Sequence, residues 1–284
     1  MRFFKPTINP DNALEVRGLR KVYTSGGKSL SKEALKGIDL TIPKGSFFAL
    51  LGPNGAGKST FINILAGLVV KTAGEAKVWG YDIIKDMRAA RRCIGVVPQE
   101  LNLDAFFTPR EVLDLQAGLF GIPEKSRRTD EILEAVGLTD MANAYARSLS
   151  GGMRRRLLVG KAMVHSPPVL ILDEPSAGVD VDLRRQLWSH VKALNSNGTT
   201  VLLTTHYLEE AEAMCDTIGI INHGQLIACE NTPDLLGRLD SKQMVITVDR
   251  DLDAVPKTLA AFAAGIDDSR TLQISFPPSR VNAG

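Results

Sequence analysis

The sequence is short of cysteine and of long apolar runs, and each shortage excludes a class of protein. Three cysteines, Cys93, Cys215 and Cys229, are scattered over 284 residues, too few and too far apart for a disulfide framework or a metal cluster. No segment reaches the roughly 20 consecutive apolar residues of a membrane-spanning helix, so we expect none. Residues 1–6 lack the apolar stretch of a secretory signal, and together these features favour a reducing cytoplasm.

An excess of charge of one sign is also missing. The chain has 34 Lys and Arg against 32 Asp and Glu, a formal net charge of +2, so nothing indicates a basic surface for nucleic acid. We therefore expect no nucleic-acid partner. What the sequence does have is a hydrophobic content of 44% and a length that suits one large α/β domain with an appendix.

A glycine-rich loop occupies residues 52–60, between apolar runs at residues 47–51 and 61–65. This order predicts a strand, a tight loop and a helix, the context that a P-loop requires. Glycines let the backbone N–H groups point at phosphates, and the helix N-terminus adds positive potential. Lys58 can reach the β- and γ-phosphates, and Ser59 can ligate Mg²⁺. The loop is predicted to bind a nucleotide.

A second glycine-rich segment lies far downstream, where Ser150, Gly151 and Gly152 precede a helical pattern. The serine is a predicted N-cap, and the free N–H groups behind it form another anion site. Alone, the pattern is a weak signal and favours a plain helix cap. The first cradle opens on the sheet and the second belongs to a helical segment, so one chain cannot easily wrap both around one phosphate.

Acidic residues and a histidine follow two predicted strands. Asp173 and Glu174 come directly after the apolar run 169–172, at the carboxyl end of a buried strand that faces a ligand. Asp173 can hold the Mg²⁺ shell there, and Glu174 can polarise an attacking water. His206 follows the strand 199–205 and is predicted to contact the γ-phosphate. No role is assigned to the other histidines: His165, His190 and His223.

In this order the motifs resemble the ATP-binding subunit of ABC transporters, over residues 14–230. The resemblance implies that residues 52–60 are the Walker A loop and that residues 149–153 are the signature. Residues 170–174 match the Walker B strand, and residues 176–180 match the D-loop.

The resemblance also assigns single residues. Tyr23 matches the aromatic that stacks on adenine, although it could instead pack against the β-layer. Gln99 matches the glutamine that contacts the metal and the membrane partner; without the resemblance it could equally be a plain polar loop residue. His206 matches the switch histidine and Asp180 the D-loop acid. Met153 stands where many relatives carry glutamine, which leaves the backbone cradle intact.

The resemblance implies ATP and Mg²⁺ as cofactors. Catalytic roles fall to Glu174, His206 and Lys58, and metal ligation to Ser59, Gln99 and Asp173. The residues expected to bind the nucleotide are Tyr23, Gly52, Pro53, Asn54, Gly55, Ala56, Gly57, Lys58, Ser59, Thr60, Gln99, Ser150, Gly151, Gly152, Asp173 and Asp180.

The implied function is ATP hydrolysis for transport, and the chain looks most similar to ATPases paired with ABC-2-type exporter permeases. Two copies would pair head to tail, and an integral membrane permease would hold them at the cytoplasmic face of the membrane. A soluble ABC ATPase acting on ribosomes or DNA is the alternative. Such proteins usually carry two cassettes or a long coiled coil, whereas this chain has one Walker A loop and no sustained heptads. An import role stays open.

The expected fold is an α/β P-loop NTPase of ABC type with a parallel sheet core, an antiparallel β-layer and a helical signature subdomain. We expect an ATPase domain over residues 1–230, with the helical subdomain at about 104–148, and a small, partly β appendix over 231–284 that ends in a loose tail. Phe106 and Phe107 are available for a docking groove, but packing in the subdomain core is favoured. Shorter patterns predict strands at 38–42, 72–79, 244–248 and 272–276, and helices at 111–115, 131–136, 181–195 and 233–239.

Overall fold

The structure is a computed structural model that describes residues 6–24, 31–176, 181–239, 242–249, 251–252, 254–256, 259, 263–268 and 270–276. The chain divides into two compact units, Met1–Cys229 and Glu230–Gly284. Asp180 and the predicted tail at residues 277–284 lie outside the described residues.

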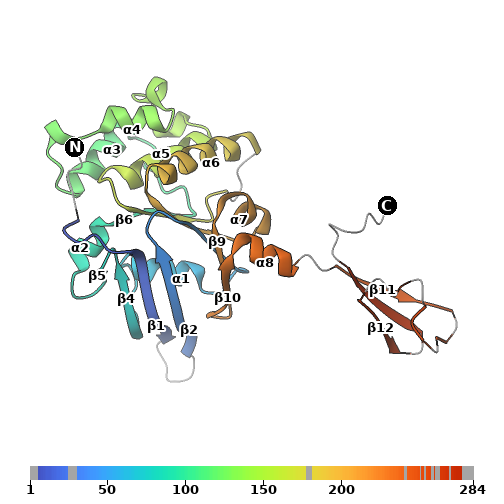
Figure 1. The fold of residues 1–284 in the computed structure, drawn as a ribbon. Helices are drawn as coiled ribbons and strands as arrows, with labels where there is room; N and C mark the ends of the chain where they lie inside the picture. The colour runs from blue at the N-terminus through green and yellow to red at the C-terminus, as the bar shows by residue number, and fades with distance from the viewer. Residues whose placement is uncertain are drawn as a thin grey trace. The chain divides into compact units, whose positions relative to one another are not determined.

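A six-stranded sheet forms the centre of the first unit, in the order β10-β9-β3-β8-β7-β6 (Figure 1). Its strands are β3 (Phe47–Leu51), β6 (Ile94–Val97), β7 (Val169–Asp173), β8 (Thr200–Thr205), β9 (Thr217–Asn222) and β10 (Gln225–Asn231). From β9 to β6 the neighbours are parallel. Their side chains are almost all buried, because helices cover parallel strands on both faces.

The helices of this layer are α1 (Lys58–Leu65), α2 (Met87–Arg92), α5 (Gly151–Met163), α6 (Val181–Ser196) and α7 (Leu208–Met214). Among the closest pairs, α5 packs on β6, α6 on β8, and α7 on β3 and β8. The carboxyl ends of β3, β7 and β8 therefore meet at one edge of the sheet, where ligands bind in open α/β folds.

An antiparallel sheet forms a second layer, with the order β2-β1-β4-β5. Its strands are β1 (Asn12–Thr24), β2 (Ser31–Pro43), β4 (Ala73–Val78) and β5 (Tyr81–Asp82). Helix α1 contacts both β7 of the central sheet and β2 and β4 of this layer, and Phe61 on α1 is fully buried in the shared core. The blue strands of Figure 1 show this layer beside α1. The strand predicted at 38–42 is confirmed within β2, and the strand predicted at 72–79 is confirmed by β4, which is one residue shorter at each end.

A helical segment separates β6 from α5 and is drawn in green in Figure 1. It contains α3 (Pro109–Leu119), η1 (Glu124–Ser126), α4 (Thr129–Ala135), η2 (Thr139–Met141) and η3 (Ala146–Ser148). A capping box between Thr108 and Glu111 starts α3. The segment shares a core with α5 that includes Leu113, Leu133 and Leu157.

The predicted helix at 111–115 is confirmed within α3, and the predicted helix at 131–136 is confirmed by α4 except for its last residue. The preference for Phe106 and Phe107 as core residues was wrong, because their side chains are 73% and 37% exposed. Both precede the capping box of α3 in a loop, so helical periodicity does not turn them inward.

The second unit contains α8 (Thr232–Leu239) and a three-stranded antiparallel sheet, β11-β13-β12. Strands β11 (Lys242–Thr247) and β13 (Thr271–Phe276) confirm the predicted β segments, but β12 (Ala263–Asp268) was not predicted. Its sequence of small residues and two acids has no β-branched alternation, and its strand conformation depends on pairing with β13.

Candidate nucleotide-binding site

The glycine-rich loop joins β3 to α1 at the carboxyl edge of the central sheet. Gly57 is the N-cap of α1 with φ 114°, in the left-handed region that favours glycine. A Cβ on Gly52 would lie 2.2 Å from the carbonyl oxygen of Ile221, and one on Gly57 would lie 2.8 Å from that of Ala34. Glycine is therefore required at both positions by close backbone approach.

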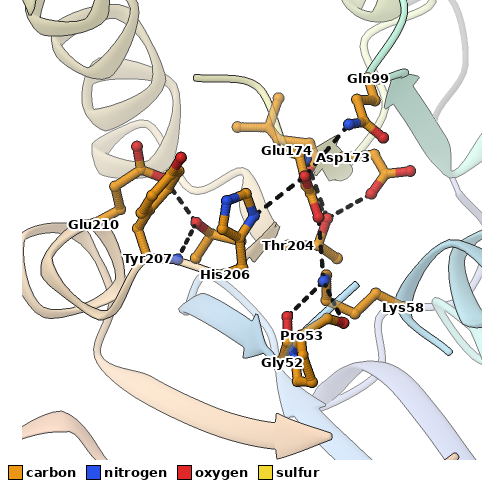
Figure 2. A network of polar contacts seen from close by, with 12 residues as sticks. Gly52, Pro53, Lys58, Gln99, Asp173, Glu174, Thr204, His206, Tyr207 and Glu210 are labelled. Atoms are coloured by element: carbon orange, nitrogen blue, oxygen red, sulfur yellow. Dashed lines mark hydrogen bonds and ion pairs between the residues drawn. The ribbon is translucent and has the colours of Figure 1, made fainter. Parts of the chain in front are cut away.

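Lys58 is buried at the start of α1, with 4% of its surface exposed. Its Nζ donates to the carbonyl oxygens of Gly52 at 2.6 Å and Pro53 at 3.2 Å. The same Nζ lies 3.1 Å from Oε1 of Glu174 (Figure 2). The ammonium is thus held at the centre of the loop, and its charge is matched by the carboxylate at the end of β7.

A cavity of about 410 Å³ opens beside the loop, within the size range of small-molecule sites. Its lining residues are Tyr23, Lys32, Ala34, Asn54, Gly55, Gly57, Lys58, Ser59, Thr60, Gln99 and Glu174. Tyr23 reaches it from the end of β1, and Lys32 pairs with Tyr23 across the β1–β2 ladder. Lys32 was not predicted, because that register is not readable from the sequence.

Glu174 connects three predicted site residues. Besides its ion pair with Lys58, its Oε2 accepts from Nε2 of Gln99 at 3.4 Å and lies 3.3 Å from Nδ1 of His206 (Figure 2). Its own backbone has φ 44°, a left-handed conformation that is uncommon for a non-glycine residue. The carboxylate lies where the loop, the glutamine segment and the histidine converge.

Thr204, on the neighbouring strand, contacts both acids. Its hydroxyl donates to Oδ1 of Asp173 at 2.6 Å and accepts from the backbone N–H of Glu174 at 3.2 Å. The next residue, Thr205, donates its hydroxyl to Oε2 of Glu210 at 2.8 Å and accepts from the N–H of Tyr207 at 3.0 Å. The sequence did not predict these contacts. The one signal for them was a pair of threonines at the end of an apolar strand.

Ser150 is the N-cap of α5, and its hydroxyl accepts from the N–H of Met153 at 3.3 Å. Within the described part of the chain, Ser150, Gly151 and Gly152 are not among the residues that line the cavity. The structure thus brings together most of the first cradle, Tyr23, Gln99 and Glu174, and leaves the second cradle outside.

Arg155 links α5 to the glutamine segment. Its guanidinium is buried and donates to the carbonyl oxygens of Pro98 at 2.7 Å and Gln99 at 2.8 Å. This burial lowers the pKa of Arg155 below its usual value. The position of Gln99 is therefore tied to the helix that begins with the second cradle.

The donor set suits Mg²⁺ bound together with a phosphate. Ser59, Gln99 and Asp173 offer hydroxyl, amide and carboxylate oxygens, the ligands that this hard cation prefers. The described residues contain no group of three or more His, Cys, Asp or Glu that would form an all-protein metal site. Mg²⁺ typically binds through one or two carboxylates plus substrate phosphates, so the residues present fit the ion.

Across the described residues, no helix has the length and apolarity to cross a membrane.

Comparison with known proteins identifies the family. The family profile described as ABC transporter matches residues 35–177. The linearmycin resistance ATP-binding protein of Bacillus subtilis is 42% identical over 82% of this chain and 73% of its own length. The daunorubicin/doxorubicin resistance ATP-binding protein of Streptomyces peucetius is 38% identical over 92% of this chain and 83% of its own. For the Nod factor export ATP-binding protein I of Ralstonia nicotianae, the identity is 37% over 93% of this chain and 81% of its own.

Solved structures agree with these relatives. An ATP-binding subunit of an ABC transporter superposes with a TM-score of 0.69 at 28% identity, over 80% of this chain and 93% of its own. A dimeric ATP-binding cassette, in a post-hydrolysis state bound to ADP and Pi, gives a TM-score of 0.68 at 28% identity, over 77% and 98%. These matches confirm the fold that the motifs predicted: an α/β P-loop NTPase of ABC type. The chain therefore belongs to the ABC transporter family and is one of its ATP-binding proteins.

Proposed function

We propose that this chain is the ATPase subunit of an exporter, which hydrolyses ATP to drive a separate membrane permease. The observation that carries the proposal is the position of Glu174, whose carboxylate lies between Lys58, Gln99 and His206 at the wall of the cavity. The relatives support an export role, because their names specify drug resistance and Nod factor export.

In this proposal the loop binds the phosphates through its N–H groups and through Lys58. An arriving γ-phosphate competes with Glu174 for the ammonium of Lys58, because the two anions need the same donor. Glu174, once released, accepts a hydrogen bond from water and orients it for attack, and His206 contacts the γ-phosphate. Tyr23 stacks on the base.

Mg²⁺ is the proposed second cofactor, and it would supply positive charge against the β- and γ-phosphates. Ser59, Gln99 and Asp173 would hold it. Phosphoryl transfer from ATP to water then yields ADP and phosphate.

We further propose that two copies pair head to tail. Ser150 and the helix start behind it are not part of the cavity beside their own loop, so they are free to complete the site of a second copy around a two-fold axis. A dimeric cassette of similar fold supports this arrangement. The D-loop acid Asp180, which lies outside the described residues, belongs to the same proposal.

The proposed membrane partner is an integral ABC-2-type permease, which would place the chain at the cytoplasmic face of the membrane as a peripheral protein. Gln99 and the helical segment after it would carry the closing motion to that partner. The soluble alternative, an ATPase that acts on ribosomes or DNA, is disfavoured by relatives whose names concern resistance and export.

The test separates binding from chemistry. Glu174→Gln is expected to keep ATP affinity and to stall hydrolysis, so that size exclusion in Mg-ATP shows a long-lived dimer. Lys58→Ala is expected to lose hydrolysis and most ATP binding. Glu209→Gln changes an exposed carboxylate on α7 and serves as the matched control. Normal turnover in Glu174→Gln, or failure of the chain to co-purify with an integral membrane protein, would count against the proposal.

A further inference from the structure

We propose that Thr204 is a positioning residue for hydrolysis, which sets Asp173 and Glu174 at once through a single hydroxyl. The inference rests on the proposed function and deepens it, because Thr204 belongs to none of the predicted motifs. It touches neither the cavity nor the Lys58 ammonium in the described contacts, and it acts through the two acids.

Thr204 lies in β8, which pairs in parallel with β7, so that Thr204 stands beside Asp173. The residue is fully buried. Its hydroxyl hydrogen is directed at Oδ1 of Asp173, with 2.6 Å between the oxygens, and a lone pair accepts the N–H of Glu174 at 3.2 Å. Figure 2 shows Thr204 between the two acids.

Each of these contacts meets a specific need. Asp173 is a proposed metal ligand, and partners behind a ligating carboxylate orient it and tune the site. Glu174 has a left-handed backbone, φ 44°, which must be held by its surroundings because such a conformation costs free energy. In the described part of the chain, its N–H donates to Thr204, to the hydroxyl at 3.2 Å and to the backbone oxygen at 3.1 Å.

A hydroxyl fills both roles with a single atom. It donates to the carboxylate and accepts from the amide at the same time, which neither a carboxylate nor an ammonium does. Water cannot substitute easily, because Thr204 is 0% exposed. Loss of the hydroxyl would therefore free the Asp173 side chain and weaken the hold on Glu174.

Thr200 provides the matched control in the same strand. It too is fully buried, and its hydroxyl accepts from the N–H of Gly45 at 2.9 Å. That contact lies at the opposite end of β8 from the acids. Thr200→Val therefore removes a buried hydroxyl of the same kind without touching the site.

The experiment compares Thr204→Val, Thr204→Ser and Thr200→Val in the full chain. Thr204→Val keeps the branched shape, and we expect a loss of about 10–100-fold in kcat, as for other partners behind metal ligands. ATP affinity in EDTA should stay at the wild-type value, while the gain in affinity on adding Mg²⁺, measured with a fluorescent nucleotide, should shrink. Thr204→Ser should restore both, and Thr200→Val should change only the melting temperature.

Three results would overturn the inference. One is wild-type kcat together with a wild-type Mg²⁺ effect in Thr204→Val. Another is a Thr204→Ser protein with as large a loss of kcat as Thr204→Val, because serine keeps the hydroxyl and the loss would then come from packing. The kcat of Thr204→Ser also tests the inference if Thr204→Val folds poorly. The third is an equal loss of kcat in Thr200→Val. A wild-type chain without ATPase activity would instead contradict the proposed function, and the Mg²⁺ effect on nucleotide affinity would still test Thr204.

Discussion

Tyr23 lies near the carboxyl end of β1 and presents an exposed aromatic ring to the cavity. Its side chain is 40% exposed, so it is not a core residue of the β-layer, and Nζ of Lys21 lies 4.8 Å from the ring centre. Stacking on a base needs only the ring face, and such contacts are worth about 1–3 kcal/mol per base.

Tyr23→Ala should therefore weaken ATP binding several-fold or more and leave the rate of the bound-state chemical step largely unchanged. Tyr23→Phe and Tyr23→Trp should keep wild-type affinity, and GTP should compete with similar affinity, because stacking does not distinguish the edges of the ring. Titration with a fluorescent nucleotide measures all three variants. Unchanged affinity in Tyr23→Ala would remove Tyr23 from the site.

His165 is a buried titratable residue away from the acids. Its Nε2 lies 2.9 Å from the carbonyl oxygen of Ile94, and its ring stacks on Phe120 at 3.8 Å. Burial lowers the pKa of His165 from 6.5 to about 4. The folded state therefore prefers the neutral ring, and the unfolded state binds the proton more readily.

The direction in which stability changes with pH follows from that difference in proton binding. The stability that the neutral ring supports is fully present above pH 6.5 and is lost as the pH falls toward 4, by about 3 kcal/mol at most. Urea unfolding at a series of pH values should show this slope. His165→Gln should flatten this slope, whereas His190→Gln, at a half-buried histidine on α6, should not. Equal slopes in all three proteins would contradict the assignment.

At the residue scale, the sequence was most informative where a motif specifies chemistry. The loop residues, Asp173 and Glu174 follow from strand ends and glycine spacing. Thr204 and Lys32 could not be predicted, because their roles depend on which strands are neighbours and in which register.

Helix α5 carries three consecutive arginines that donate to backbone carbonyls, and two of them, Arg155 and Arg156, each donate to a pair of carbonyls. Arg155 donates to the carbonyls of Pro98 and Gln99, whereas Arg156 donates from Nη1 to the carbonyls of Val136 at 2.8 Å and Gly137 at 3.0 Å. Arg155 connects α5 to the glutamine segment, and Arg156 connects it to the end of α4. A guanidinium suits such paired acceptors, and an ammonium does not reproduce its fork.

Arg155→Lys should therefore loosen the segment around Gln99 without removing the positive charge. We expect a loss of about 1–3 kcal/mol of stability and faster amide hydrogen exchange in peptides that cover residues 99–103. ATP turnover should fall as well, because Gln99 contacts Glu174. Arg156→Lys is the control, with faster exchange at the end of α4 instead; identical exchange patterns in both variants would contradict the separate links.

Elements with strong periodicity or strong caps were predicted well. The predicted helix at 181–195 is α6, and the serine cap at Ser150 starts α5. The exposure of Phe106 and Phe107 was not predicted, because an apolar side chain in a loop carries no periodic signal for burial. Strand β12 was not predicted for a related reason, since pairing with β13 overrides its weak intrinsic preference for the strand conformation.

The two glycine-rich cradles make a prediction at the scale of the whole assembly. Lys58→Ala removes the cation of the first cradle, and Ser150→Arg fills the second. If the chains pair head to tail as proposed, a mixture of the two variants should form heterodimers with one intact composite site, whereas neither homodimer has any. With random mixing and independent sites, about a quarter of wild-type ATPase activity should return.

Each variant alone should be inactive, and Lys58→Ala at the same total protein concentration provides the baseline. Size exclusion in ATP monitors whether the chains associate. Full activity in either single variant would contradict a site shared between two chains.

The layered architecture was predictable as a class, from strands and helices that alternate along the chain. The order of the strands in the central sheet could not be predicted. Consecutive strands β6, β7 and β8 are neighbours, but β3 lies between β8 and β9, and no local pattern in the sequence encodes that crossover. The division after residue 229 lies one residue before the boundary expected from the sequence, and β10 runs through it without a break.

The left-handed backbone of Glu174 carries a conformational cost at the residue proposed to orient the attacking water. Glycine adopts φ near +44° at little cost, so Glu174→Gly should resist heat better than Glu174→Ala while being equally unable to orient water. The wild-type glutamate offsets part of this strain, because its carboxylate lies 3.1 Å from the buried ammonium of Lys58 and balances that charge. Residue 174 therefore combines a strained backbone with an ion pair that both of these variants would lose.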